Sequence, residues 1–520
     1  MSPSVVVNPR VDERGATFRW LGLALACSLI PAACQAEARP SVPVGSGGPS
    51  ASTAFAPNTT GSPEPALARA LRGAIDVDDI LADLDRLQQI ADEHDGTRAA
   101  GTAGHEASVD FVAGELRAAG YAVDLQPVDL AAFLQVAPSR IAIDTPGAPA
   151  LEDLRDFKAM TYSAAGEVTA KVFALGFDPN AKPGDRNGQG CEAAAWAGVP
   201  VGVIVLLQPG PCPRHDAVVH AQAAGAVAVV TSYADWSRDH VLRPTLIEPA
   251  DIHIPVVGTT HRAGLALQDA ATTGASVHLA THTIAEHRSS LNVIGETPGG
   301  DTSNIVMLGG HLDSVMDGPG INDNGSGTMT VLEVARELVA LTAAVPAAAP
   351  RWKVRVAFWT GEELALFGSA AYAHELGVQR DGPIRAYLNF DMLGSPNGIV
   401  AVYDEAATSR PESAAITRLF TGALDAAGLP WELETIGPAS DHFPLEQAAI
   451  PVGGLFSGAN ALKTADQATT FGGTAGAAMD ACYHLACDTR TNVDPVLLEQ
   501  LARAAAWVTG ALASGEVTLH

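Results

Sequence analysis

The chain has 520 residues, which exceeds one ordinary domain and predicts two or three. Because 47% of the residues are hydrophobic and 17% are charged, the chain can bury a large core. A formal net charge of −27 opposes close approach to nucleic acid, so we expect no nucleic-acid partner.

Residues 1–36 have the layout of a signal peptide. Basic residues precede an apolar run, Trp20–Ala33, that is too short to cross a bilayer, and small residues follow it. Two interpretations of the leader's end stay open. Ala36–Ala38 suits an ordinary signal peptidase, whereas Pro31–Cys34 resembles a bacterial lipobox in which Cys34 is lipidated, although that pattern prefers Leu where Pro31 stands. We expect an exported protein, either secreted or anchored by lipid on the outer side of the membrane.

Residues 37–70 are predicted to form a disordered tether, because Ser, Pro, Gly, Ala and Thr dominate residues 37–66. Order is expected from about residue 75, where apolar residues recur at helical spacing as far as Ile90. A second helix is predicted over Ala107–Ala119, and a strand over Tyr121–Val128.

Residues 141–285 are predicted to be an inserted β-rich domain without catalytic residues. The β-like runs are Val201–Leu207 and Ala226–Thr231, and they surround one predicted helix, Asp216–Ala224. The segments Val203–Cys212 and His220–Val230 resemble a protease-associated domain. This resemblance does not identify a partner for the insert.

From Asn292 onward, predicted strands and helices alternate. The strands are Ile305–Leu308, Val354–Trp359, Ala386–Phe390, Ile399–Val402 and Val452–Phe456. The helices are Gly325–Leu341, Glu362–Leu376, Ser413–Ala427 and Pro495–Ala513. This alternation predicts an α/β fold with a mostly parallel twisted sheet and helices on both faces. We assign residues 71–140 and 286–520 to this catalytic domain.

Polar clusters follow these strands, where ligand sites of parallel sheets form. A pair of zinc ions in a hydrolase needs two histidines, one bridging acid, two terminal acids and a free acid for proton transfer. The clusters supply all six: His311, His484, Asp323, Glu363, Asp391 and Glu362. No later segment has about 20 uninterrupted apolar residues, so no transmembrane helix is predicted.

Three stretches, Gly309–Val315, Gly318–Gly327 and Cys482–Thr489, closely resemble the secreted bacterial aminopeptidases with co-catalytic zinc. Thr97–Tyr121 is similar to the opening segment of the same family. The resemblance implies a zinc-peptidase fold, two zinc ions per chain, and hydrolysis of the first peptide bond of substrates with a free N-terminus.

The resemblance also implies the ligand of each zinc ion. His311 and Asp391 would bind one ion, Glu363 and His484 would bind the other, and Asp323 would bridge them.

Three further roles follow from the resemblance. Glu362 would be the general base, and Tyr483 would donate a hydrogen bond to the developing oxyanion. Asp313, two residues after His311, would be the acid that orients its imidazole.

The cysteines outside the leader form two close pairs with none left over, which is typical of disulfides in an oxidising compartment. With the family in view, Cys191–Cys212 would fix the insert, and Cys482–Cys487 would close a loop around His484.

The predicted first-residue pocket is apolar. Met392, Phe456 and Phe471 stand on loops from which related enzymes line this pocket. The alternative is that these three residues are ordinary core residues. The resemblance thus favours Leu, Met or Phe at the substrate N-terminus.

Two other function classes stay open. Relatives of the same fold include carboxypeptidases and glutaminyl cyclases, but the motif loops here offer no Arg or Lys for a terminal carboxylate. A non-enzymatic binding protein would have lost ligands that this chain keeps.

One departure from the family pattern is Ala439, which stands where family members often carry Arg before the Ser-Asp-His triplet.

Overall fold

The computed structural model describes residues 64–182, 185–233, 240–346, 349–378, 382–404 and 410–519. The leader, Cys34 and most of the tether lie outside the described residues. The predicted tether extends too far, because residues 66–70 belong to a helix, α1 (Ala66–Ala74). Leu67 and Leu71 are one helical turn apart and buried, so α1 is held by packing that the composition of the segment does not reveal.

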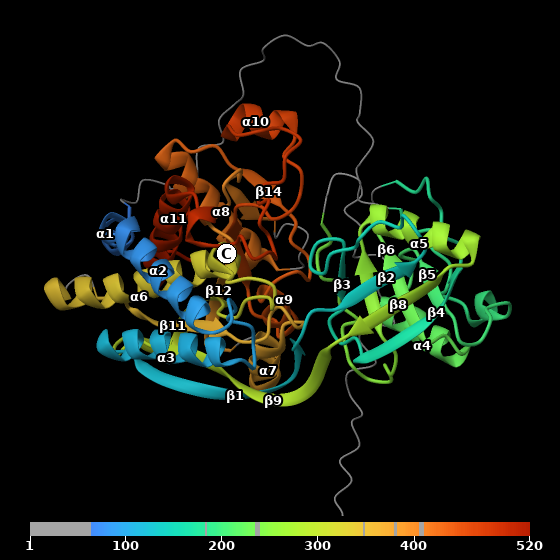
Figure 1. Cartoon of the computed structure of the whole chain (residues 1–520). Coiled ribbons are helices and arrows are strands. Elements are labelled where there is room, and N and C mark those ends of the chain that lie inside the picture. Colours follow the sequence, from blue (N-terminus) through green and yellow to red (C-terminus); the bar gives the residue numbers. More distant parts are fainter. Residues whose placement is uncertain are drawn as a thin grey trace, which may run out of the picture. The chain divides into compact units, whose positions relative to one another are not determined.

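The catalytic domain contains an eight-stranded sheet of order β1-β9-β11-β10-β12-β15-β13-β14. Figure 1 labels β1, β9, β11, β12 and β14 among these strands. The strands are β1 (Ala122–Gln135), β9 (Thr283–Glu296), β10 (Asp301–His311), β11 (Trp352–Trp359), β12 (Ile384–Phe390), β13 (Ala401–Tyr403), β14 (Glu432–Glu434) and β15 (Val452–Phe456). The central strands β11, β10, β12 and β15 are parallel. Their carboxyl ends therefore meet at one edge, where the polar clusters begin.

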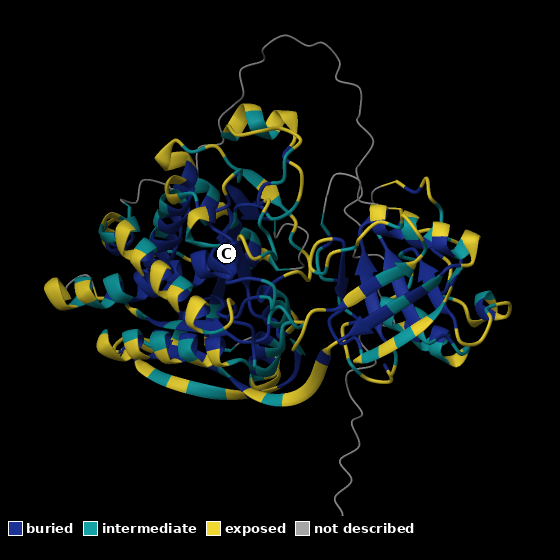
Figure 2. Cartoon of the chain, in the orientation of Figure 1, coloured by how far each residue is buried: buried dark blue, intermediate teal, exposed yellow. Residues whose placement is uncertain are grey.

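Helices cover both faces of this sheet, which confirms the predicted fold class. One face packs α1, α2 (Val77–Glu93), α3 (Ala103–Ala118), α6 (Gly327–Ala344), α8 (Pro411–Ala427) and α11 (Pro495–Ala513). The other face packs α7 (Phe367–Leu376) and α9 (His442–Gln447). Both faces are buried (Figure 2), so the strands are apolar on both sides: Val306 faces the first layer and Met307 the second. None of the described helices combines the length and apolar character that crossing a membrane requires.

The insert leaves and re-enters the catalytic domain through β1 and β9. These strands pair along their whole length, from Ala122 opposite Glu296 to Gln135 opposite Thr283. Between them lies a seven-stranded sheet of order β2-β8-β4-β5-β6-β7-β3. Its strands are β2 (Arg140–Asp144), β3 (Phe157–Ala159), β4 (Gly166–Ala174), β5 (Ile204–Leu207), β6 (Ala228–Ser232), β7 (Val256–Thr259) and β8 (Ser276–Thr281).

The insert has a second long helix that the sequence analysis missed. Besides α4 (Arg214–Ala223), α5 (His261–Thr273) packs Leu267 and Ala270 into the insert core. Ala, Gly and Thr make up much of α5, so its apolar stripe is faint in the sequence.

Two helices of the catalytic domain begin later than predicted. The turn Ile321–Ser326 precedes α6, and Asp323 within it has φ −107° and ψ 91°. The expected helical start at Glu362 is wrong, because α7 begins at Phe367 and positive φ angles at Ala365 and Leu366 interrupt the chain before it. The acids before both helices therefore stand on irregular loops.

Candidate metal centre

His311 ends β10 and is buried between two carboxylates. Its Nε2 atom lies 3.3 Å from Asp323 Oδ1 and 3.5 Å from Asp391 Oδ1. Its Nδ1 atom lies 3.0 Å from the carbonyl oxygen of Asp313. Because a carbonyl only accepts, Nδ1 carries the proton and Nε2 presents its lone pair to the acids.

His484 has an equivalent environment on the loop closed by a disulfide. Its Nε2 atom lies 3.1 Å from Glu363 Oε2 and 3.2 Å from Asp323 Oδ2. Asp323 therefore turns one carboxylate oxygen to each histidine. The structure thus brings all five predicted ligands together in two groups that share Asp323.

These groups fit metal ions. Tetrahedral coordination with bonds of about 2.0–2.1 Å places neighbouring ligand atoms about 3.3 Å apart, close to the four separations given above. Asp323 Oδ2, Glu363 Oε1 and Asp391 Oδ1 are buried and have no hydrogen-bond partner among the described residues. A cation beside these buried carboxylate oxygens would compensate for their missing hydrogen bonds.

The pKa of His311 also indicates a site that favours positive charge. Burial opposes protonation of the imidazole, but the carboxylates of Asp391 and Glu362 outweigh burial and raise its pKa well above the usual value. The site therefore attracts positive charge to the space beside Nε2.

Glu362 stands apart from the other acids of the site. Among the described residues, its carboxylate forms no ion pair with either imidazole, whereas Glu363 pairs with His484. Burial, together with the neighbouring acids, raises the pKa of Glu362 well above its ordinary range. A carboxylate with a raised pKa is suited to accept a proton.

Asp313 contacts His311 through its backbone, because its carboxylate Oδ1 is 3.9 Å from Nδ1. That oxygen instead accepts a hydrogen bond of 3.2 Å from the backbone N–H of Glu362. Burial raises the pKa of the Asp313 carboxyl to about 7.

Arg98, which the sequence analysis did not single out, is fully buried beneath the site. Its guanidinium donates to the carbonyl oxygens of Leu312, Pro319 and Gly320. Burial lowers its pKa to about 10, so it stays charged at neutral pH. One side chain thus holds both the segment after His311 and the segment before Asp323.

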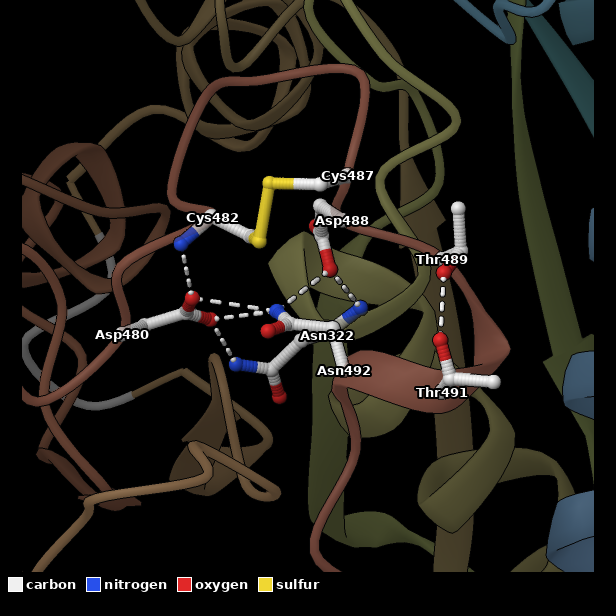
Figure 3. The surroundings of a disulfide bond; sticks show 8 residues. All are labelled: Asn322, Asp480, Cys482, Cys487, Asp488, Thr489, Thr491 and Asn492. Carbon is white, nitrogen blue, oxygen red and sulfur yellow. Dashed lines mark hydrogen bonds between the residues drawn. A yellow bond between two sulfur atoms is a disulfide. The ribbon is translucent and has the colours of Figure 1, made fainter.

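Asp488 was also missed, although it directly follows the disulfide Cys482–Cys487 (Figure 3). It accepts hydrogen bonds from the backbone N–H groups of Asn322 at 2.9 Å and Asp323 at 3.0 Å. Asp480, on the other side of the disulfide, accepts from the Asn322 side chain at 2.7 Å. The disulfide loop is therefore bound to the backbone of the shared ligand.

Asp391 is oriented by a third set of missed residues. Ser440 Oγ donates to Asp391 Oδ2 at 2.7 Å, and Asn389 Nδ2 donates to Ser440 Oγ at 2.8 Å. The Ser-Asp-His triplet that contains Ser440 was the available signal.

The three residues predicted to bind the substrate are buried or partly buried. Met392 is buried, and its carbonyl oxygen accepts from the N–H of Ser457, the residue after Phe456. Phe456 and Phe471 are partly buried and pack in one cluster.

The ring of Tyr483 stacks on the His484 imidazole, with 3.8 Å between centroids. Both expected disulfides, Cys191–Cys212 and Cys482–Cys487, are present.

Comparison with known proteins gives two family matches: residues 292–509 match peptidase family M28, and residues 168–267 match the PA domain. An aminopeptidase of Pseudomonas aeruginosa is 37% identical over 467 residues, or 87% of this chain and 85% of that protein. The probable lipoprotein aminopeptidase LpqL of Mycobacterium tuberculosis is 37% identical over 86% of this chain and 87% of its own. Leucine aminopeptidase 2 of Arthroderma otae is 34% identical over 85% and 86%.

Two solved structures share the fold. The aminopeptidase from Aneurinibacillus sp. strain AM-1 has a TM-score of 0.65 at 22% identity, covering 85% of this chain and 95% of that chain. BSAP, a zinc aminopeptidase from Bacillus subtilis, has a TM-score of 0.62 at 21% identity, covering 88% and 98%.

The fold, the site and these relatives together define a peptide hydrolase of the aminopeptidase type. The chain belongs to peptidase family M28 and carries a PA domain as an insert.

Proposed function

We propose that the chain is an exported aminopeptidase that holds two zinc ions and releases apolar residues from the N-termini of peptides. The observation that carries this proposal is the carboxylate of Asp323, which offers a different oxygen to each of two histidine-carboxylate groups. A bridging carboxylate of this kind serves two ions a few ångströms apart.

His311 and Asp391 would hold one zinc ion, Glu363 and His484 would hold the other, and Asp323 would be shared by the two. The donor set of imidazole nitrogen and carboxylate oxygen suits zinc. Bound zinc supplies Lewis acidity and lowers the pKa of coordinated water toward neutrality.

Glu362 is proposed to take a proton from the attacking water and to deliver it to the nitrogen of the leaving amine. Tyr483, beside His484, donates its O–H to the oxygen that gains negative charge. Asp313 supports both groups, since its carbonyl holds His311 and its carboxylate holds the backbone of Glu362.

The substrate's first side chain is proposed to bind against Met392, Phe456 and Phe471. Burial of a methylene there contributes about 0.8 kcal/mol, and these side chains offer no carboxylate to Lys or Arg. The free amine pairs with site acids such as Glu362 and Asp391.

Export is proposed from the leader-like residues 1–36, the two disulfides and the relative described as a probable lipoprotein. A lipid anchor at Cys34 remains part of this proposal. Globomycin, which blocks lipoprotein signal peptidase, tests it: accumulation of a larger precursor in the host would support the anchor, and unchanged processing would contradict it.

Hydrolysis of aminoacyl-nitroanilides beside their N-acetylated copies tests the activity. We expect the highest kcat/KM for Leu, Met or Phe, loss of activity after chelation, and its return with two zinc ions per chain. Equal rates for Lys and Leu would contradict the apolar pocket. Efficient cleavage of N-acetylated copies would contradict the aminopeptidase itself, and cleavage from the C-terminus would favour a carboxypeptidase.

A further inference from the structure

The insert has a cavity of about 280 Å³ at the carboxyl edge of its parallel strands. Arg214, the first residue of α4, stands on one wall. Tyr233 directly follows β6, and Thr260 directly follows β7 and caps α5. The carboxyl edge of parallel strands is where such sheets bind ligands, and helices that begin there add positive potential.

Arg214 provides a cation in this cavity with hydrogen-bonding capacity to spare. Its Nε donates to the Tyr233 hydroxyl at 2.6 Å, its Nη1 makes a longer contact of 3.4 Å with the Thr245 carbonyl, and the guanidinium lies over the Tyr233 ring. A guanidinium has five N–H donors, and Nη2 has no partner among the described residues. Arg214 also forms no ion pair with a described acid, and the described lining contains no Asp or Glu.

A second arginine of the lining, Arg243, links the cavity to the metal centre. Arg243 donates to both carboxylate oxygens of Asp317, which also accepts from Lys158 Nζ at 2.8 Å. Asp317 lies midway along the segment that joins His311 to Asp323, so this part of the lining is bound to the loop that carries two proposed ligands.

A second contact leads to the other ligand loop. Asn460 also borders the cavity. Its neighbour Ala459 accepts a hydrogen bond of 2.7 Å from the N–H of Asp480, two residues before Cys482. Residues of the cavity lining, or their direct neighbours, are therefore bonded to both loops that carry proposed ligands. An extended peptide gains about 3.3 Å per residue, so a substrate that reaches this cavity from the metal centre would be hydrolysed best at one particular length.

We propose that this cavity binds the C-terminal carboxylate of a short peptide substrate, with Arg214 as the anchor. The inference rests on the proposed function and names its substrate class as peptides of a few residues with a free carboxyl end. A guanidinium fork matches a carboxylate in shape and charge. In a chain with a net charge of −27, such a local cation is needed to hold an anionic peptide end.

The test compares Leu-Gly, Leu-Gly-Gly and Leu-Gly-Gly-Gly with their C-terminal amides, and uses Leu-nitroanilide as a substrate without a carboxylate. Wild type should show a lower KM for the free acid than for the amide at one preferred length. Arg214→Gln should raise KM for that acid about tenfold and leave the amide unchanged, since one charged hydrogen-bonded pair is lost. Arg214→Lys should restore part of the difference. Arg140→Gln, an exposed position on β2 at the far side of the insert sheet, is the matched control.

The outcomes separate the two proposals. If wild type hydrolyses Leu-nitroanilide but the acid-to-amide ratio of KM is the same in wild type and Arg214→Gln at every length, the carboxylate site is wrong and the aminopeptidase stands. If Leu-nitroanilide is not hydrolysed by the zinc-loaded wild type, the proposed function itself fails. Equal loss for acid, amide and nitroanilide in Arg214→Gln would assign a structural role and overturn the inference.

Discussion

Glu362 and Glu363 are adjacent in sequence but have different surroundings. Glu363 pairs with His484, whereas Glu362 lies near His311 and Asp391 and makes no ion pair with an imidazole among the described residues. Both acids stand on the irregular turn before α7, in which Ala365 and Leu366 have positive φ angles and both donate their N–H groups to the Glu362 carbonyl.

Replacement of Glu362 by Gln should therefore remove the proton carrier and leave the metal ligands intact. We expect kcat to fall by about 10²-fold or more, with zinc content near that of wild type. Steady-state kinetics on Leu-nitroanilide and metal analysis of the same sample measure this. Glu363→Gln is the matched comparison, which should lose zinc as well. Near-normal turnover of zinc-loaded Glu362→Gln would show that another group carries the proton.

The residues proposed to contact a metal could be selected from the sequence more readily than the residues that position them. His311, Asp323 and His484 belong to a proposed ligand set whose chemistry restricts the residue types. Arg98 and Asp488 act through backbone groups, to which many side chains can bond. No residue type is specific to that task, so the sequence pattern gave no reason to select them.

The loop between Asp480 and Asp488 carries His484 and is bound to the turn Ile321–Ser326. The Asp488 carboxylate accepts hydrogen bonds from two backbone N–H groups of that turn and from the side-chain amide of Asn492. The position of Asp323 therefore depends on the same element that positions His484.

The substitution Asp488→Asn should weaken metal binding more than folding. Either orientation of the new amide points its NH₂ group at an N–H donor, so the backbone of Asp323 must shift. We expect zinc affinity to fall about 10- to 100-fold, as is common for residues that orient ligands. Competition with a fluorescent chelator measures the affinity. Asp480→Asn removes the same charge nearby without touching the Asp323 backbone, and an equal loss in both variants would mean that charge alone is responsible.

The bounds of some elements of the catalytic domain were predicted correctly, whereas β9 and β14 were not predicted and two helix starts were displaced. β15 and α11 have the bounds that their apolar patterns predicted. The starts of α6 and α7 were displaced because buried polar loops satisfy their backbone groups through tertiary contacts, such as Arg98 with Gly320. Spacing within a segment cannot report such contacts.

At the scale of the whole molecule, the order of domains could be predicted, because a β-rich segment has a different sequence pattern from a segment of alternating strands and helices. The contacts that join the insert to the catalytic domain could not be predicted. Lys158 and Arg243 belong to the insert, whereas Asp317 belongs to a loop of the catalytic domain far along the chain. All three side chains are at most 7% exposed. A buried ion cluster of this kind is visible only in the folded chain.

This cluster should make the stability of the molecule depend on pH. Burial opposes ionisation of Asp317, but Arg243 and Lys158 outweigh burial and lower its pKa to about 2. Since that pKa is below the unfolded value of about 3.9, ionised Asp317 stabilises the folded chain above pH 4 by about 3 kcal/mol, and this contribution is lost as pH falls toward 2.

The isosteric variant Asp317→Asn should therefore have a lower Tm than wild type at pH 7, also because it leaves two buried cations without a carboxylate. The difference in Tm should stay constant from pH 7 to about pH 4 and shrink below it, because protonation then removes the same charge from wild type. Thermal unfolding at several pH values measures this, with Asp144→Asn on the exposed side of β2 as the control. A Tm difference that does not change with pH would mean that the hydrogen bonds of Asp317, and not its charge, hold the insert against the loop between His311 and Asp323.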